Sequence, residues 1–252
     1  MTTQLIQYVA HRGYTAHYPE NTEVALSAAV KAGARYVEID VQLTADGEPI
    51  LFHDRSLERL CGCAGAIHQL HFNEVQALKV SDTHRFGYRY AQNPVMSLQQ
   101  FCAWLSKRPQ VTAFVELKRI SLQQFGHQAV LDAVTPLLIP IQQQVVIISY
   151  DLEALAEVRR VGQFPIGAVF DDWKEHKQKI IGQLKPEYLF CDWHSLPRWG
   201  HVRNPWGQLA VYECTDPVVA NRLVKQGVNL VETFAIGEMI RGEHMDALPP
   251  WA

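Results

Sequence analysis

Residues 36–54 read YVEIDVQLTADGEPILFHD, and this stretch decides the fold. Its first half alternates aliphatic and polar residues, which is the period of a β-strand with two different faces. One face carries the carboxylates of Glu38 and Asp40 side by side. The other face is aliphatic and consists of Val37, Ile39 and Val41. Charges at alternate positions also fit the solvated face of an antiparallel strand, so this pattern alone does not define a site.

The second half of the stretch predicts a turn and a further short strand. Asp46-Gly47 is a typical tight-turn pair. Residues 48–52 then form a strand that delivers His53 and Asp54. Extended runs that end in ionisable residues recur elsewhere in the chain, and this recurrence favours a functional interpretation. Asp54 either orients His53 or caps the next turn, and the sequence leaves both open.

The rest of the chain alternates short apolar strands with helical patterns, which is typical of a parallel sheet covered by helices. We expect further strands at residues 5–10, 111–118, 144–149, 165–170, 188–191, 208–214 and 228–233. We expect helices from Asn21 or Thr22 to Gly33, at 98–106, 122–138, 152–161, 175–184 and 217–225, and near Glu238. Eight strand–helix units in 252 residues predict an α/β protein with a closed (β/α)8 TIM barrel. The first helix lacks a G-x-G-x-x-G opening, which counts against a dinucleotide-binding fold.

The alternation weakens between residues 56 and 94. Small residues, scattered polar groups and aromatics occur there without a sustained period, apart from a short helix expected at 73–78. We interpret residues 1–252 as a single barrel domain and 56–94 as a small insertion after the second strand. Because this insertion begins beside His53, we expect it to form a cap over the substrate.

Composition and charge exclude several classes of partner. The formal net charge is −3 without a long basic run, which argues against binding to nucleic acid or to a membrane surface. No apolar stretch approaches the ~20 residues that span a bilayer, and the first residues do not resemble a signal peptide. The five cysteines are odd in number and lack framework spacing, as expected for reduced thiols. We therefore expect a cytoplasmic protein without stable membrane insertion.

Ionisable residues gather where the predicted strands end, and in a barrel these ends form the active face. They are His11, Arg12, Glu38, Asp40, His53, Glu116 and Lys118. Three of them are acids, and burying unpaired carboxylates together is unfavourable. A divalent cation resolves the conflict, and an all-oxygen site suits Mg²⁺ or Ca²⁺.

Several short motifs together resemble the glycerophosphodiester phosphodiesterase family, through most of the chain and most densely in its first 120 residues. They are HRG from His11, PENT from Pro19, E-I-D from Glu38, T-x-D-G from Thr44, HD from His53 and E-L-K from Glu116. The resemblance implies a metal-dependent barrel enzyme of glycerol and lipid metabolism. Its small-molecule substrates would be glycerophosphodiesters, which are hydrolysed to sn-glycerol 3-phosphate and an alcohol.

The resemblance also implies a role for each of the seven residues at the strand ends. The metal ligands would be Glu38, Asp40 and Glu116. The acid/base pair would be His11 and His53, and the phosphate contacts would be Arg12 and Lys118. The chemistry is consistent with these roles, because phosphodiester cleavage needs charge neutralisation, a base and an acid. Which histidine serves as acid, and whether water or the neighbouring glycerol hydroxyl attacks, stays open.

Two strand ends depart from the family pattern. Val211-Tyr212-Glu213-Cys214 stands where a W-T-V-N type is frequent, and Glu232-Thr233-Phe234 stands where T-D-x-P is frequent. These departures leave the headgroup open, including a phospholipase D-like action on lysophospholipids. A non-catalytic barrel that binds a phosphoester is the third hypothesis, but such a barrel needs no pair of histidines.

The other candidates have ordinary interpretations. We expect Asn21 to cap a helix, and Glu213 to be solvated or structural. The tryptophans Trp193, Trp199 and Trp206 fit either a pocket or ordinary packing. The remaining histidines are expected to be bystanders: His17, His68, His71, His84, His127, His176, His194, His201 and His244.

Overall fold

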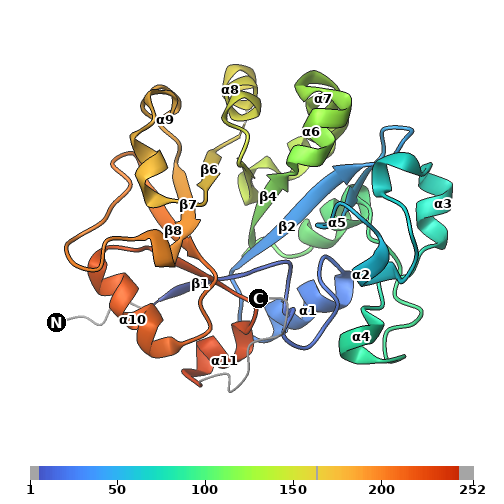
Figure 1. Ribbon diagram of the computed structural model, residues 1–252, viewed down its shortest axis with the longest axis horizontal. Coiled ribbons are helices and arrows are strands. Elements are labelled where there is room, and N and C mark those ends of the chain that lie inside the picture. Colours follow the sequence, from blue (N-terminus) through green and yellow to red (C-terminus); the bar gives the residue numbers. More distant parts are fainter. Residues whose placement is uncertain (1–5, 163, 244–252) are drawn as a thin grey trace.

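The computed structural model describes residues 6–162 and 164–243, and in this part of the chain eight parallel strands close into a barrel (Figure 1). β1 pairs with both β2 and β9, which closes the ring, and the short β3 pairs antiparallel with the end of β2. The strands are β1 (Gln7–Ala10), β2 (Tyr36–Leu43), β3 (Pro49–Leu51), β4 (Thr112–Leu117), β5 (Val145–Ser149), β6 (Ile166–Phe170), β7 (Tyr188–Asp192), β8 (Gln208–Tyr212) and β9 (Leu230–Thr233). The predicted (β/α)8 barrel is confirmed.

The two faces of β2 show how the sequence sorts its side chains. Val37, Ile39 and Val41 are buried in the large core between the strands and the surrounding helices. The residues between them on each strand point into the barrel. There a second apolar cluster fills the part of the interior away from the carboxyl ends of the strands. This cluster contains Val9, Phe114, Val146, Ile148, Val169, Phe190, Ala210 and Leu230. Charged groups therefore have room only at the carboxyl ends of the strands.

Helices surround the barrel, as Figure 1 shows. The helices outside residues 56–94 are α1 (Glu23–Lys31), α5 (Leu98–Leu105), α6 (Arg119–Phe125), α7 (His127–Leu138), α8 (Leu152–Val161), α9 (Lys179–Leu184), α10 (Pro217–Gln226) and α11 (Ile236–Arg241). Short 3-10 turns are η2 (Ile139–Gln144), η3 (Trp173–Lys177) and η4 (Trp193–Ser195). No helix in the described ranges is long and apolar enough to cross a bilayer.

Two predicted helices are each divided in the structure. The helix predicted at 122–138 is α6 followed by α7, because Gly126 adopts φ 80° and ψ 157° and interrupts the helical backbone. The helix predicted at 175–184 consists of the 3-10 turn η3 and then α9. Both predictions located the helical segments correctly and were wrong about their continuity.

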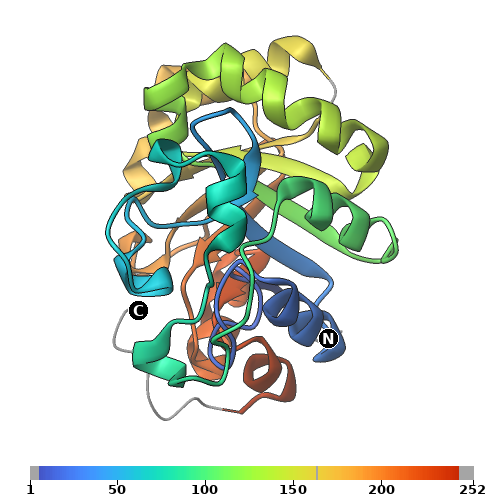
Figure 2. The ribbon, with the colours of Figure 1, turned by 90° about the vertical axis from the view of Figure 1, so that its right-hand side faces the viewer.

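Residues 56–94 form a compact addition on one side of the barrel, facing the viewer in Figure 2. Their elements are α2 (Glu58–Cys61), η1 (Ile67–Gln69), α3 (Phe72–Ala77) and α4 (Thr83–Phe86). They pack around an apolar cluster of their own, which includes Leu57, Leu60 and Val75 and is joined by Ile50 and Phe52 from the end of the β2–β3 ribbon. The insertion is thus folded and has its own small core. Its role as a cap stays a prediction.

Candidate active site

A small cavity of about 90 Å³ opens at the carboxyl end of the barrel. It collects ionisable side chains that are far apart in sequence, as expected for the active face of this fold. Six of the seven predicted site residues line it: His11, Arg12, Glu38, His53, Glu116 and Lys118. The seventh, Asp40, is fully buried and forms ion pairs with Arg12 and Lys118, two of the residues that line the cavity.

Asp40 is neutralised by its surroundings. Arg12 Nε lies 3.1 Å from Oδ2, and Lys118 Nζ lies 3.2 Å from Oδ1. Burial alone would raise the pKa of Asp40, but Lys118 and Arg12 hold it well below its usual range. This carboxylate therefore orders the two cations of the site.

Asn21 also holds Asp40, and its predicted role as a helix cap is wrong. Its Nδ2 donates to Asp40 Oδ2 at 2.8 Å, and its Oδ1 accepts from the Asp40 N–H at 3.1 Å. The cap of α1 is instead Thr22, whose hydroxyl oxygen accepts from the Ala25 N–H. Thr22 occupies the N-cap position itself, so Asn21 one residue earlier is free to reach β2.

Glu38 and Glu116 line the cavity and have fewer positively charged partners than Asp40. Glu38 Oε2 accepts the backbone N–H of Arg12 at 3.1 Å, whereas its buried Oε1 has no hydrogen-bond partner in the described structure. Burial raises the pKa of Glu38 well above its usual value, and nearby Asp40, Glu232 and Glu116 raise it further. Glu116 Oε1 lies 3.0 Å from Lys118 Nζ.

The three predicted acids fit a divalent cation. Glu38, Asp40 and Glu116 each place a carboxylate oxygen within 4.8 Å of the other two. The unpartnered Oε1 of Glu38 supplies a buried acceptor, and carboxylate oxygens are the ligands that Mg²⁺ and Ca²⁺ prefer. The donor set therefore suits a hard cation.

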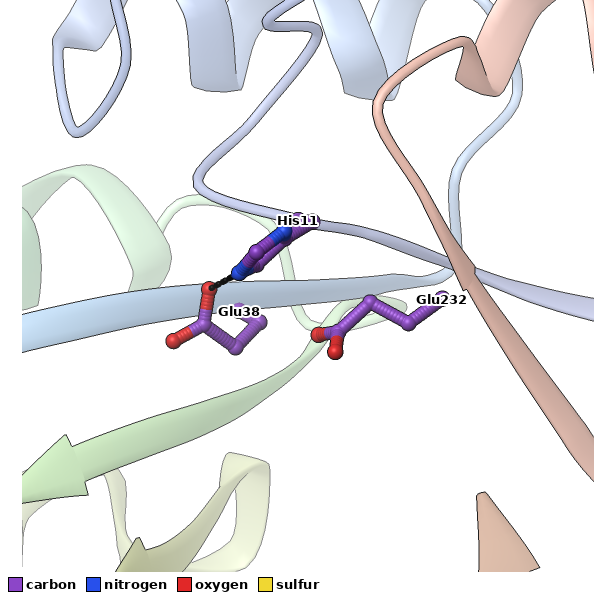
Figure 3. A group of neighbouring side chains, drawn as sticks. All are labelled: His11, Glu38 and Glu232. Atoms are coloured by element: carbon purple, nitrogen blue, oxygen red, sulfur yellow. Dashed lines mark ion pairs between the residues drawn. The ribbon is translucent and has the colours of Figure 1, made fainter. Parts of the chain in front are cut away.

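His11 is held between two carboxylates. Its Nδ1 forms an ion pair with Glu213 Oε1, and its Nε2 lies 3.8 Å from Glu38 Oε2 (Figure 3). Burial lowers the pKa of His11, but the charge and hydrogen bond of Glu213, together with the charge of Glu232, outweigh burial and Arg12, and the net pKa is raised. The expectation that Glu213 is solvated or structural is wrong, because this side chain lines the cavity and binds His11.

Glu232 is a second acid of the cavity to which the sequence reasoning gave no individual role. It lies on β9, only 4% of the residue is exposed, and it lines the same cavity. Burial raises the pKa of Glu232 to about 7, and Glu213 and Glu116 contribute against the opposing charges of His11 and Arg12. The sequence does contain a signal for this position. Glu232 follows the inward-facing Leu230 by two residues, and residues two apart on a strand point to the same face.

His53 belongs to a chain of ion pairs that leads back to Arg12. His53 Nδ1 lies 2.9 Å from Asp54 Oδ1, so Asp54 orients the histidine. Arg59 from α2 donates to Asp54 and to the buried Glu20, with bonds of 2.7–2.8 Å. Glu20 in turn accepts from Arg12 Nη1 at 3.1 Å. Arg59 therefore links the insertion to the site in two ways. It binds Asp54, which pairs with His53, and it binds Glu20, which pairs with Arg12 next to His11.

Aromatic side chains complete the wall of the cavity. Tyr150 and Tyr212 both line it, with their hydroxyl oxygens 2.9 Å apart, and Tyr212 also donates to the carbonyl of Phe170. The three tryptophans considered above do not line this cavity. Among the described histidines, only His11 and His53 line it, and His244 lies outside the described residues.

The family model described as the glycerophosphoryl diester phosphodiesterase family matches residues 11–196. The chain belongs to this family. The resemblance inferred from the motifs is confirmed, and the matched residues contain the seven predicted site residues but neither Glu213 nor Glu232.

Individual relatives share parts of the chain. The Bacillus subtilis protein YqiK is 29% identical over 153 residues, which are 60% of this chain and 61% of that protein. Human glycerophosphodiester phosphodiesterase 1 is 34% identical over 98 residues, which are 39% of this chain and 30% of that protein. The matched segments thus span less than two thirds of these relatives' own lengths.

Solved structures share the whole fold. A phosphodiesterase from Oleispira antarctica, in complex with the product sn-glycerol-3-phosphate, is similar with a TM-score of 0.82 and 22% identity, covering 94% of this chain and 96% of that one. The glycerophosphodiester phosphodiesterase from Thermotoga maritima gives a TM-score of 0.72 and 20% identity, covering 94% and 98%. At these identities the similarity establishes the fold.

Proposed function

We propose that this protein is a metal-dependent phosphodiesterase that hydrolyses glycerophosphodiesters to sn-glycerol 3-phosphate and an alcohol. The observation that carries the proposal is one cavity that combines two histidines, two cations and a cluster of carboxylates. Family membership and a structural neighbour in complex with sn-glycerol-3-phosphate support this substrate class. We further propose a cytoplasmic location, since all five cysteines are free thiols.

We propose Glu38, Asp40 and Glu116 as the ligands of Mg²⁺ or Ca²⁺. When bound, this cation would offset charge on the phosphate oxygens. Arg12 and Lys118 would add hydrogen bonds to the same phosphate, because Asp40 already orders both side chains at the cavity wall. Preordered donors lose little entropy when the substrate arrives.

We assign the proton transfers to Nε2 of His11 and of His53. Each ring has a carboxylate at Nδ1, Glu213 for His11 and Asp54 for His53. Because a carboxylate accepts a hydrogen bond, the Nδ1 atom of each ring carries a proton. Nε2 is then the atom that takes a proton from the attacking oxygen on one side or gives a proton to the departing alkoxide on the other.

An assay of the purified protein with glycerophosphocholine tests the proposal directly. We expect sn-glycerol 3-phosphate and choline as products, with the activity lost after chelation and restored by Mg²⁺ or Ca²⁺. Lysophosphatidylcholine in a parallel assay tests the phospholipase D-like alternative. Binding of sn-glycerol 3-phosphate without turnover of any diester would instead support the non-catalytic barrel and overturn the proposal.

Changing Glu213 to Gln will reveal which proton transfer His11 performs. Removing this negative charge destabilises the imidazolium, so the pKa of His11 falls and its limb of the pH–rate profile moves to lower pH. If His11 is the base, the acidic limb of kcat/KM moves. If His11 is the acid, the alkaline limb moves. The control is Glu153→Gln, an exposed change on α8. A profile with both limbs unmoved would contradict the role of Glu213.

Shortening the insertion will test its role as a cap. Val80 and Asn93 are joined by a backbone hydrogen bond of 2.8 Å, so residues 83–91 are removable with a short turn in their place. This deletion leaves Arg59 and the cluster around Leu60 in place. We expect a folded protein with altered kcat/KM ratios among glycerophosphodiesters of different alcohols. Unchanged ratios in a folded variant would show that this part of the insertion does not contact the headgroup.

A further inference from the structure

Glu232 is buried, and no cation among the described residues forms an ion pair with its carboxylate. Only 4% of it is exposed, and its Oε1 has no hydrogen-bond partner in the described residues. Other acids of the site have ion-pair partners, since Asp40 contacts Arg12 and Lys118, and Glu213 contacts His11. The positive charges of His11 and Arg12 lie near Glu232 but form no ion pair with it in the described residues, so this buried carboxylate favours a further positive group or a proton.

Glu38 on β2 has an unpartnered carboxylate oxygen of the same kind. Its Oε1 is also buried and unpartnered in the described structure. Figure 3 shows the carboxylate of Glu232 extending from β9 toward the side chain of Glu38. The two residues and His11 each offer a ligand atom within 4.8 Å of the others. Two oxygens that bind one cation at about 2.3–2.6 Å lie at most ~5 Å apart, so this spacing suits a shared ion.

We propose that Glu232 is a ligand of a divalent cation, which it binds together with Glu38. This inference rests on the proposed function only in requiring that the protein binds such a cation. The acid comes from β9, outside the residues matched by the family model and at a strand end that departs from the T-D-x-P pattern. His11 belongs to the same group of atoms, but its Nδ1 is paired with Glu213, and we confine the proposal to the two carboxylates.

The competing explanation is a proton shared between the two acids. A shared proton would also relieve the repulsion between Glu38 and Glu232, but it would compete with the metal for Glu38, so Glu232→Gln would then not weaken metal binding. A ligand role predicts that removing the Glu232 charge weakens metal binding and simultaneously relieves repulsion in the metal-free protein. The two explanations therefore differ in a binding measurement that needs no catalysis.

The test is a Mn²⁺ titration of the full chain, monitored by the electron paramagnetic resonance signal of free Mn²⁺. We compare the wild type with Glu232→Gln and with the exposed control Glu153→Gln. The expected result is a Kd at least ~10-fold higher for Glu232→Gln, with the control unchanged. Glu232→Asp, which retains the charge, should recover part of the affinity. An unchanged Kd for Glu232→Gln would overturn the proposal.

Thermal unfolding gives a second readout that also reports folding. Without metal, Glu232→Gln should have a Tm equal to or above that of the wild type, because it removes a buried charge that has no ion-pair partner in the described residues. On addition of Mn²⁺ or Mg²⁺, its Tm should rise less than that of the wild type, since stabilisation by a ligand grows with the logarithm of its affinity. An equal rise in both proteins would overturn the proposal.

These measurements separate the inference from the proposed function. If the wild type binds Mn²⁺ and Glu232→Gln binds it weakly, yet no glycerophosphodiester is cleaved, the substrate proposal fails and the role of Glu232 stands. If the wild type is an active metal-dependent enzyme and Glu232→Gln keeps its affinity, the proposed function stands and Glu232 is not a ligand. A wild type without Mn²⁺ affinity would overturn both.

Discussion

Replacing Glu38 with Gln will weaken cation binding and hydrolysis together while the protein still folds. Glu38 belongs to both groups of potential ligands, and its Oε1 is a buried acceptor without a partner in the described structure. Gln keeps one oxygen to accept the Arg12 N–H but removes the negative charge. We expect hydrolysis to fall at least ~10²–10³-fold, the typical effect of losing one preorganised electrostatic contact.

The measurement combines Mn²⁺ titration, hydrolysis of glycerophosphocholine and thermal unfolding on the same preparation. Because burial and the neighbouring acids already raise the pKa of Glu38, a neutral side chain suits the metal-free fold, and the Tm should not fall. Glu153→Gln serves as the matched exposed control. Wild-type activity after exhaustive chelation, or normal Mn²⁺ affinity in Glu38→Gln, would contradict this prediction.

Asp40→Asn is a less selective test of the same site. Asp40 contacts Arg12 and Lys118, and both cations lose their shared anion in this variant. Breaking buried ion pairs from one side typically costs about 3–5 kcal/mol of folding stability. A loss of activity in Asp40→Asn would therefore combine weaker metal binding with a disturbed phosphate site, whereas Glu38→Gln isolates the ligand.

The second large effect is expected from the two histidines. His11→Ala and His53→Ala should each reduce the hydrolysis rate by at least ~10²–10⁴-fold, the usual contribution of one general acid or base. Metal affinity should change little in either variant, because the assigned carboxylates remain. The wild-type rate should be bell-shaped in pH, with one histidine required neutral and the other charged.

A substrate with an activated phenolate leaving group will separate the two roles. This group departs with little protonation, so the variant that lacks the acid should regain much of its rate, and the variant that lacks the base should gain much less. The assignment must agree with the limb that moves in Glu213→Gln. Equal rescue of both variants, or of neither, would show that the histidines do not divide the work in this way.

The sequence was sufficient for the parts of the site that depend on local pattern. Alternation within a single strand placed Glu38 and Asp40 on one face, and the strand ending at Lys118 did the same for Glu116. The strand end after Ala10 placed His11 and Arg12. These are relations between residues a few positions apart, and strand geometry fixes them without knowledge of the rest of the fold.

The sequence was insufficient where the site depends on which strands adjoin. Glu213 and Glu232 lie at the ends of short apolar strands, and strand alternation indicates which way their side chains point. Their proximity to His11 follows only from the closure of the barrel. Asn21 was assigned to the helix start because its type suits a cap, and its contact with Asp40 is tertiary. Gly126 divides two helices although the apolar pattern continues across it, since a single glycine is compatible with a helix until its backbone angles are known.

The pairing of β1 with β9 has a consequence for biosynthesis. Val9 pairs with Glu232, and the His11 N–H donates to the Thr233 carbonyl at 3.1 Å, so the first strand is held in place by the last. On the ribosome, every residue of the predicted HRG and E-I-D motifs emerges long before its partners from β8 and β9. Parallel pairings between distant segments form late in folding. The nascent chain should therefore be catalytically silent until its final strand docks, and a fragment ending before Leu230 should gain activity only when a peptide that supplies β9 is added.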